Sequence, residues 1–323
     1  MDFNVGVIGA GAFGSAISQQ LSKNLDDVIL LLRNENLCRD INAKGYNTKY
    51  YPNVKLNGNI RATLDINDLK DCEVIFLTIP SSAYRSTLDE LKEVASEDVI
   101  LVTTAKGIEY PSLKTMSKII AEYPFENIVA LSGPNFASEI MLNLPSITNI
   151  ASTDIEISRH VKEILETKQF KVKIIEDIEG IELCGILKNI NAIANGICEG
   201  LNINENARFA VLTKGFNDTI RIIEAVGGKS QTVQEYCGFG DLILTSTSKE
   251  SRNHTLGVLY GQRLIINENA SGIVFEGKNS IRAIKDICTD NGVESCIVDF
   301  VYEVIIEKIT PIQAFNKLWD KLE

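Results

Sequence analysis

A glycine-rich turn close to the N-terminus constrains the fold of this chain more than any other feature. Residues 9–14 read Gly-Ala-Gly-Ala-Phe-Gly, directly after an apolar run at residues 4–8 and before a run of small helix-forming residues. This G-x-G-x-x-G pattern, in a strand–turn–helix setting, is typical of a dinucleotide-binding site. Gly9 permits the tight turn, Gly11 lets the backbone approach a pyrophosphate, and Gly14 lets the helix pack closely on the strand. The anion then lies at a helix N-terminus; a plain turn with glycine packing is the alternative.

The residue that follows the second predicted strand bears on the choice of cofactor. NAD-specific sites usually carry an acidic residue at this point, ~20 residues after the glycine turn, for the ribose hydroxyls. Here Arg33 follows the predicted strand at residues 28–32, and the nearest carboxylate in the sequence is that of Glu35. Because an arginine can stack on adenine or meet a 2′-phosphate, we expect NADP, or both cofactors, to be used. A solvated surface arginine is the alternative.

Short apolar runs alternate with helical stretches through the first half of the chain. The runs lack polar alternation, which indicates strands buried on both faces, as in a parallel sheet with helices on each side. The predicted strands are residues 4–8, 28–32, 74–79, 99–104, 128–132, 147–151 and 170–175, and the predicted helices between them include 12–21, 83–94, 113–122 and 155–165. This order predicts an α/β domain of the doubly wound Rossmann type over residues 1–178.

The pattern becomes helical after about residue 177. The predicted helices are residues 181–201, 206–226, 253–259, 280–290, 294–306 and 311–322, and the second of them ends at a Gly-Gly pair, a good helix stop. No strand is predicted in this half. We therefore expect a second, all-α domain over residues 179–323, joined to the first by a chain that passes into a long helix.

Charge and composition exclude several classes of function. The chain has 43 acidic and 32 basic residues, a net charge of −11, which is opposite in sign to the basic footprint of a nucleic-acid binder. A basic pocket for a small anion stays compatible with this charge. No apolar run approaches the ~20 residues of a membrane span, and the N-terminus lacks the basic region of a signal peptide, so we expect neither a span nor a cleaved signal. Seven cysteines without a C-x-x-C pair predict no disulfide framework and indicate a cytoplasmic protein, and two histidines argue against a metal site.

A lysine in an otherwise apolar predicted helix is the leading candidate for proton transfer. Lys188 shares one helix face with Asn191 and Asn195. Burial of a lysine is costly and lowers its pKa, so such a lysine can act as a base near neutral pH. A lysine that reaches solvent, or that pairs with a carboxylate, is the alternative.

Two segments after predicted strands are candidate ligand sites in the first half. Lys106 follows the strand at residues 99–104, at the carboxyl end where open α/β sheets bind ligands. Residues 131–137 end another strand and begin a helix, whose free amides attract an anion. Loop solvation and ordinary turn chemistry are the alternatives.

A carboxylate and a polar helix start are the candidates in the second half. Asp241 leaves a glycine turn, and ten residues later Ser251, Arg252 and Asn253 precede a predicted helix. Arginine offers a planar fork for a phosphate, so this helix start is a candidate phosphate site; an N-cap with a solvated arginine is the alternative. We expect the neighbouring His254 to be a surface residue.

These segments, in this order, resemble the NAD(P)-dependent glycerol-3-phosphate dehydrogenase family over nearly the whole chain. The matching blocks are residues 9–14, 105–109, 132–137, 187–189, 240–242, 251–253 and 276–277. The resemblance implies a Rossmann domain, a helical domain like that of 6-phosphogluconate dehydrogenase, and an active cleft between them. It implies reversible hydride transfer between C4 of the nicotinamide of NAD(P) and C2 of dihydroxyacetone phosphate or sn-glycerol 3-phosphate, which supplies glycerol 3-phosphate for phospholipid synthesis.

The resemblance also implies roles for single residues, without a metal. Lys188 would be the proton acceptor, and Asp241 would orient it or a substrate hydroxyl. The candidate cofactor-binding residues are Gly9, Gly11, Ala12, Phe13, Gly14, Arg33, Lys106, Ala137, Arg252 and Glu276. The candidate substrate-binding residues are Lys106, Gly133, Asn135, Lys188, Asp241, Ser251, Arg252 and Asn253. The family usually has Ser or Thr at the position of Asn135, so a hydroxyl donor is replaced by an amide.

Two other functions stay open on the sequence. One is a dehydrogenase of the same architecture that acts on a hydroxy acid or a sugar nucleotide. The other is a non-catalytic NADP-binding regulator, which would keep the glycine turn but would not need Lys188, Asp241 or Arg252. The expected partner is a small-molecule substrate, with no nucleic acid and no membrane span, and a homodimer is compatible with the sequence.

Overall fold

The computed structural model describes residues 4–264 and 275–322 and divides into two compact units. The first, which we call the sheet unit, consists of Met1–Ala105 and Met116–Ile178. The second, the helical unit, consists of Lys106–Thr115 and Glu179–Glu323. The short segment Lys106–Thr115 therefore groups with the helical residues, although it lies within the first half of the sequence.

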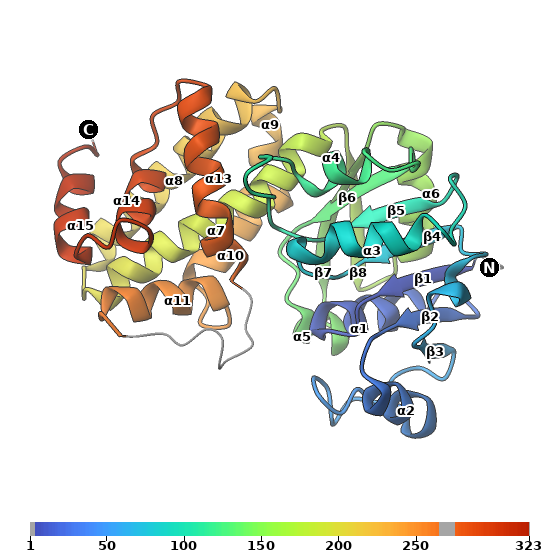
Figure 1. Ribbon diagram of the computed structural model, residues 1–323. Coiled ribbons are helices and arrows are strands. Elements are labelled where there is room, and N and C mark those ends of the chain that lie inside the picture. Colours follow the sequence, from blue (N-terminus) through green and yellow to red (C-terminus); the bar gives the residue numbers. More distant parts are fainter. Residues whose placement is uncertain (1–3, 265–274, 323) are drawn as a thin grey trace. The chain divides into compact units, whose positions relative to one another are not determined.

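The sheet unit is built on eight strands in the order β3-β2-β1-β4-β5-β6-β7-β8 (Figure 1). The strands are β1 (Val5–Ile8), β2 (Val28–Leu31), β3 (Ile60–Thr63), β4 (Val74–Leu77), β5 (Ile100–Thr103), β6 (Ile128–Ser132), β7 (Ser146–Ser152) and β8 (Phe170–Ile175). All neighbouring pairs are parallel except β6 and β7. This sheet confirms the predicted doubly wound fold class.

Strand β1 lies where the strand order changes direction. Val5 is opposite Val28 of β2 on one side and Val74 of β4 on the other. Doubly wound sheets bind ligands at the carboxyl ends of the strands beside such a switch point. Residues 9–14 follow β1 directly, so the fold places the glycine turn at that position.

Helices cover both faces of the sheet. Val5 and Val7 of β1 are buried in one core cluster with Ile17, whereas Ile8 is buried in a second cluster with Leu88. Successive side chains of a strand point to opposite faces, so the two clusters lie on opposite sides. The helices of this unit are α1 (Ala12–Leu21), α2 (Glu35–Lys44), α3 (Tyr84–Leu91), α4 (Met116–Ile120), α5 (Ala137–Met141) and α6 (Ile155–Leu165), with the 3₁₀ turns η1 (Ile66–Leu69) and η2 (Ser81–Ala83).

The structure differs locally from the sequence expectations. The sequence does not predict strand β3, because this strand is short, lies at the sheet edge and carries the exposed Arg61. Strand β7 runs antiparallel to β6, although an all-parallel sheet was expected. An apolar run reports burial on both faces and carries no information on strand direction. The helix expected at residues 113–122 is limited to α4.

The helical unit is arranged around α7, the longest helix of the described residues. Nearly all of α7 is buried, including its polar residues Lys188, Asn189, Asn191 and Asn195. Among the described residues of this unit, the helices are α7 (Ile178–Gly200), α8 (Glu205–Ala225), α9 (Ser230–Val233), the π-helical turn η3 (Tyr236–Gly240), α10 (Asp241–Thr247), α11 (Arg252–Gly261), α13 (Glu276–Asp290), α14 (Cys296–Ile305) and α15 (Pro311–Trp319). The first residue of α7, Ile178, is counted with the sheet unit. As the sequence predicts, the second half is helical.

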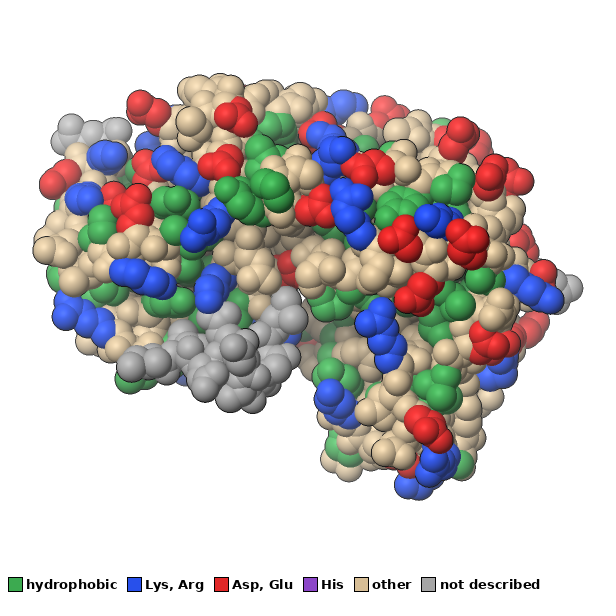
Figure 2. All heavy atoms as spheres, in the orientation of Figure 1, with side chains coloured by type: hydrophobic (Ala, Val, Ile, Leu, Met, Phe, Trp, Pro, Cys, Tyr) green, Lys and Arg blue, Asp and Glu red, His purple; other side chains and the backbone are tan. Residues whose placement is uncertain are grey.

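Two further observations concern the lengths of the helices and the surface charge. None of the helices in the described ranges combines the length and the apolar character needed to cross a bilayer. On the face drawn in Figure 2, basic and acidic side chains are interspersed and do not gather into one basic patch.

Candidate functional site

Four polar side chains meet in the interior of the helical unit. The Nζ atom of Lys188 lies 2.6 Å from Oδ1 of Asp241 and 2.8 Å from Oγ1 of Thr245. The other carboxylate oxygen, Oδ2 of Asp241, lies 2.7 Å from Nζ of Lys106. Asp241 is 1% exposed and Lys188 is 7% exposed. One buried carboxylate therefore pairs with two ammonium groups, an arrangement we call the lysine–aspartate cluster (Lys106, Lys188, Asp241 and Thr245).

The electrostatics of the cluster bring the pKa of Lys188 close to neutral pH. Burial and, to a smaller extent, the charge of Lys106 lower the pKa of Lys188, and Asp241 opposes both effects; the net result is a pKa of about 7. Burial alone would raise the pKa of Asp241, but the ammonium groups of Lys106 and Lys188 outweigh burial and lower it. Asp241 is thus a carboxylate, whereas Lys188 can gain or lose a proton near pH 7.

Local sequence explains how Asp241 and Thr245 reach this position. Asp241 is the first residue of α10, where a negative charge is favourable to the helix dipole. The turn η3 before it packs tightly, because a Cβ on Gly238 would lie 2.2 Å from the carbonyl oxygen of Val233. Thr245 is one helical turn after Asp241 and donates to its Oδ1 at 3.0 Å. The sequence interpretation missed Thr245, although the i,i+4 spacing places both on one face.

The predicted phosphate residues lie at the start of α11. Ser251 caps this helix by accepting a hydrogen bond from the backbone N–H of His254 at 3.2 Å, as the N-cap alternative expected. Arg252 is exposed and Asn253 is half-buried. A Cβ on Gly277, in the first turn of α13, would lie 3.0 Å from both Cβ of Asn189 and Oδ1 of Asn253. This glycine therefore brings the start of α11 beside α7, one residue from Lys188; Glu276 begins α13 next to it.

The expectation that His254 is a surface residue was wrong. His254 is 3% exposed, and its Nε2 lies 3.2 Å from a carboxylate oxygen of Glu199 on α7. The sequence shows this residue only at a helix start, where solvent exposure is common. Its burial comes from the packing of α11 on α7, which local sequence does not report.

The glycine turn in the sheet unit has the geometry that a pyrophosphate requires. Gly9 has φ +109°, and a Cβ on Gly14 would lie 1.8 Å from the carbonyl oxygen of Gly9. In contrast, a Cβ on Gly11 would meet nothing within 4 Å. Gly11 is the N-cap residue of α1 and provides no side-chain cap, and a helix leaves its first amides without partners inside the helix. Open space beside uncapped amides is what an anion needs, so the residues fit a dinucleotide.

Neighbouring side chains that the sequence interpretation missed hold this turn in place. The amide of the buried Asn47 donates to the carbonyl oxygen of Ala10 at 3.0 Å, and the hydroxyl of Tyr51 donates to that of Ala12 at 3.1 Å. Ala12 and Phe13 form the first turn of α1. Arg33 lies exposed shortly after β2.

The remaining predicted residues of the sheet unit lie around the end of β6. Asn135 donates through Nδ2 to the carbonyl oxygen of Ile147 at 2.9 Å. A Cβ on Gly133 would lie 2.9 Å from Oδ1 of Asn135, so the asparagine turns back over the glycine. Ala137 begins the short helix α5. Asn135 thus also has a structural role here, as a link to β7.

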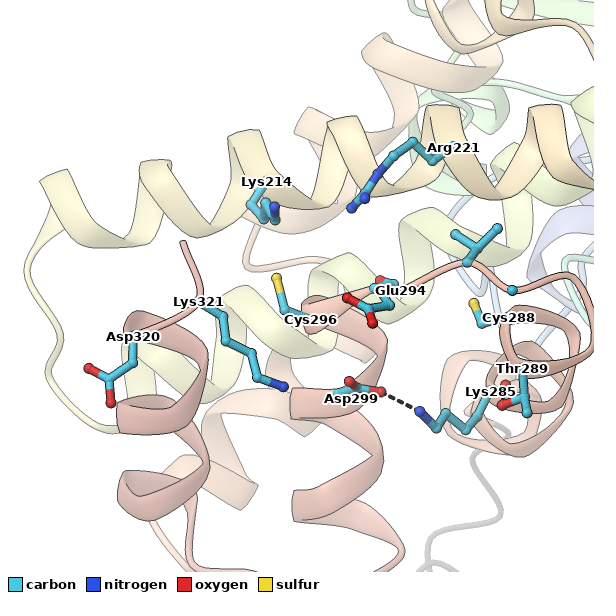
Figure 3. Close-up of a pocket in the computed structure, with 13 residues that line it drawn as sticks. Lys214, Arg221, Lys285, Cys288, Thr289, Glu294, Cys296, Asp299, Asp320 and Lys321 are labelled. Carbon is cyan, nitrogen blue, oxygen red and sulfur yellow. Dashed lines mark hydrogen bonds and ion pairs between the residues drawn. The ribbon is translucent and has the colours of Figure 1, made fainter. Parts of the chain in front are cut away.

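The helical unit also contains a cavity of about 740 Å³ (Figure 3). It is lined by residues of α8, α13 and α14 and of the chain near Asp320, and it includes no residue of the lysine–aspartate cluster. Lys285 and Asp299 form an ion pair of 2.5 Å across it. Within the described ranges, no group of His, Cys, Asp and Glu could hold a metal ion.

The fold and the cluster together define a class of protein, the nicotinamide-dependent dehydrogenases. A glycine turn for a dinucleotide and a near-neutral buried lysine are the parts that hydride transfer with proton transfer requires. Comparison with known proteins gives the family. The model of the NAD-dependent glycerol-3-phosphate dehydrogenase N-terminus matches residues 4–158, and that of the C-terminus matches residues 177–316. The chain belongs to this family and is an oxidoreductase, as the sequence resemblance predicted.

Individual relatives agree along nearly the whole chain. The chain is 40% identical over 306 residues to a glycerol-3-phosphate dehydrogenase [NAD(P)+] of Methanothermobacter thermautotrophicus, covering 94% of this chain and 93% of the relative. It is 34% identical to one of Halothermothrix orenii, covering 98% and 95%. Among solved structures, glycerol-3-phosphate dehydrogenase from Coxiella burnetii is similar with a TM-score of 0.93 at 28% identity, covering 99% of both chains.

Proposed function

We propose that this chain catalyses reversible hydride transfer between C4 of NAD(P) and C2 of dihydroxyacetone phosphate or sn-glycerol 3-phosphate. The observation that carries the proposal is the buried lysine–aspartate cluster in a chain of this family, with Lys188 at a pKa of about 7. When bound, the cofactor donates or accepts the hydride. The residues of the chain have to bind the substrate, direct a proton and stabilise the oxygen on which charge develops.

Beside Asp241 and Thr245, the Nζ atom of Lys188 has one further hydrogen-bonding position, which we assign to the substrate. A neutral amine has two protons and one lone pair, and Lys188 uses two protons for Asp241 and Thr245. Its lone pair, or the third proton of the ammonium form, is therefore directed away from both partners. Toward the alcohol, the third proton of Lys188 stabilises the carbonyl oxygen and is delivered to it. In the reverse direction, neutral Lys188 takes the hydroxyl proton.

The other cluster residues set the state of Lys188. Asp241 and Thr245 fix the position of Nζ. Lys106 contributes a second positive charge that disfavours the protonated form of Lys188. The pair of lysines also makes the cluster suitable for an anionic substrate, because their charges exceed the single charge of Asp241 when both are protonated.

We propose the remaining contacts by family resemblance and from the geometry of each element. The substrate phosphate binds at Ser251, Arg252 and Asn253, with Gly133 and Asn135 as further substrate contacts. The pyrophosphate binds at the glycine turn, where the space beside Gly11 is open. The cofactor contacts further comprise Ala12, Phe13, Lys106, Ala137, Arg252 and Glu276.

NADP(H) is the preferred cofactor in this proposal. Arg33 is exposed shortly after β2, where it could contact a 2′-phosphate or an adenine ring, and the nearest carboxylate in the sequence is that of Glu35. The proposal assigns residues 1–178 to cofactor binding and residues 179–323 to the substrate, with Lys106–Thr115 grouping with the latter by contact. It places the protein in the cytoplasm, because all seven cysteines are free thiols, as expected in a reducing compartment. It further describes a homodimer that supplies glycerol 3-phosphate for phospholipid synthesis.

A spectrophotometric assay tests this function. Purified protein is mixed with dihydroxyacetone phosphate and with NADPH or NADH in turn, and nicotinamide oxidation is followed. We expect turnover with both, faster with NADPH at low cofactor concentration. A panel of 2-keto acids in place of dihydroxyacetone phosphate is the control. Turnover with a keto acid alone would favour the other dehydrogenase class, and cofactor binding without any turnover would favour a regulator.

A further inference from the structure

Backbone-to-backbone packing holds α11 against α7. A Cβ on Gly196 of α7 would lie 2.1 Å from the carbonyl oxygen of His254. A Cβ on Gly257 of α11 would lie 2.2 Å from the carbonyl oxygen of Ile193. No real side chain fits at such distances, so the two helices touch through their main chains. The position of α11 along α7 is therefore fixed to within a small tolerance.

A second contact, independent of the glycines, joins the first turn of α11 to α7. His254 is buried, and its Nε2 lies 3.2 Å from Glu199. Burial lowers the pKa of His254, so the neutral ring donates its Nε2–H to the carboxylate. Arg208 of α8 pairs with the same carboxylate at 2.5 Å and donates to Asn195 of α7 at 2.9 Å. The histidine is thus one member of a polar network that ties three helices together.

The place of His254 in α11 gives this network a consequence for the site. His254 follows Arg252 and Asn253 directly, and its backbone N–H is the group that Ser251 caps. The same turn meets Asn189, the neighbour of Lys188, through Gly277. We therefore expect a change at His254 to release the first turn of α11, which carries Arg252 and Asn253, while the glycine contacts hold the rest of the helix. The lysine–aspartate cluster keeps its own hydrogen bonds.

We infer that His254 is a positioning residue that fixes Arg252 and Asn253 relative to Lys188 through its hydrogen bond to Glu199. This inference rests on the proposed function, because it concerns the phosphate of that substrate. It assigns a role to a residue for which the sequence pattern indicates none. The hydrogen bond sets the distance between the group that holds the phosphate and the group that transfers the proton.

Kinetics of His254→Leu and His254→Gln test the inference. Leucine removes the donor, and glutamine keeps an N–H near the position of Nε2. A hydrogen bond to a charged group corresponds to about a tenfold effect or more. We expect His254→Leu to raise KM for dihydroxyacetone phosphate about tenfold, with kcat changed less than about twofold, and His254→Gln to restore most of the loss. Glu199→Ala removes the acceptor from the α7 side, where it is partly exposed, and should give the same split.

Dihydroxyacetone, which lacks the phosphate, separates positioning from general damage. We expect its kcat/KM to be unchanged in His254→Leu, because a misplaced phosphate site cannot affect a substrate without phosphate. His160→Leu, at the other histidine of the chain, is the matched control and should leave every constant unchanged. Equal losses with both substrates, equal losses in the leucine and glutamine variants, or no loss in any variant would overturn the inference. Absence of dihydroxyacetone phosphate reduction by the unmodified protein would instead overturn the proposed function.

Discussion

The two units differ in the kinds of groups that we propose contact the ligands. In the sheet unit the groups are main-chain atoms: Gly9 and Gly14 shape the turn, and the space beside Gly11 is open because it has no side chain. In the helical unit they are buried charged side chains, chiefly Lys188 and Asp241. Backbone amides keep the same charge at every pH, whereas the charge of Lys188 changes near pH 7. Binding in the sheet unit and proton transfer in the helical unit should therefore be separable by mutation and by pH.

Replacement of Lys188 has the largest expected effect. Lys188→Ala removes the proton-transfer group and leaves Asp241 with Lys106 as its partner. Loss of a general acid–base group costs about a hundredfold or more in turnover. We expect kcat with dihydroxyacetone phosphate to fall by at least that factor, while the dissociation constant of NADPH, measured by fluorescence titration, stays within about twofold.

A surface lysine provides the control for this variant. Lys162 of α6 is partly exposed in the sheet unit, and Lys162→Ala should leave kcat unchanged. If Lys188→Ala turned over at close to the normal rate, the proton would have to come from another group. A large loss of NADPH affinity would show that the two units are not separable in this way.

The same contrast explains how much the sequence could predict. The glycine turn is contiguous, so its motif predicts the strand, the turn and the helix together. Asp241 and its partner lysines are separated by 53 and 135 residues, and no local pattern predicts that one carboxylate bridges both. Family resemblance named these residues, but it did not give their geometry.

Residues that the sequence interpretation missed are fixed by tertiary contacts. Thr245 shares a helix face with Asp241. The π-helical turn before α10 interrupts the helical periodicity, so the sequence pattern does not indicate where α10 begins. His254 is buried because glycines let α11 approach α7. Asn47 holds the glycine turn from a segment without regular secondary structure. Periodicity reports which face of an element is apolar, and none of these contacts depends on that.

Removal of the second lysine should shift the pH dependence of the reaction. In the direction of alcohol oxidation the active form is neutral Lys188, so the rate rises with pH through about 7. The charge of Lys106 lowers the pKa of Lys188, and therefore Lys106→Met should raise it. We expect the rise in kcat to move to higher pH by about one unit, the scale of a nearby like charge. A pH–rate profile at saturating glycerol 3-phosphate measures this, and a profile that stayed in place or moved to lower pH would contradict it.

Thr245 should have a smaller effect on the same step. Thr245→Val keeps the shape of the side chain but removes the acceptor that Lys188 uses at 2.8 Å. One buried hydrogen bond is worth about 1 kcal/mol, or roughly fivefold in rate. We expect kcat to fall about fivefold with little change in the pH profile, because Asp241 still pairs with Lys188. Thr245→Ser, which keeps the hydroxyl, is the control and should retain most of the activity.

The smallest expected effect is at Arg33, the side chain of the sheet unit that we assign to cofactor choice. Arg33 is exposed, so its charge is partly screened by solvent and its contribution to binding is modest. Arg33→Asp replaces a group that attracts a 2′-phosphate with one that repels it. We expect the ratio of kcat/KM for NADPH to that for NADH to fall about threefold, with kcat for NADH unchanged. Arg39→Asp, on the exposed side of α2 and paired with Glu35, is the control. An unchanged ratio in Arg33→Asp would mean that the sheet unit recognises the cofactor through main-chain atoms alone, which would make the contrast between the units sharper than we propose.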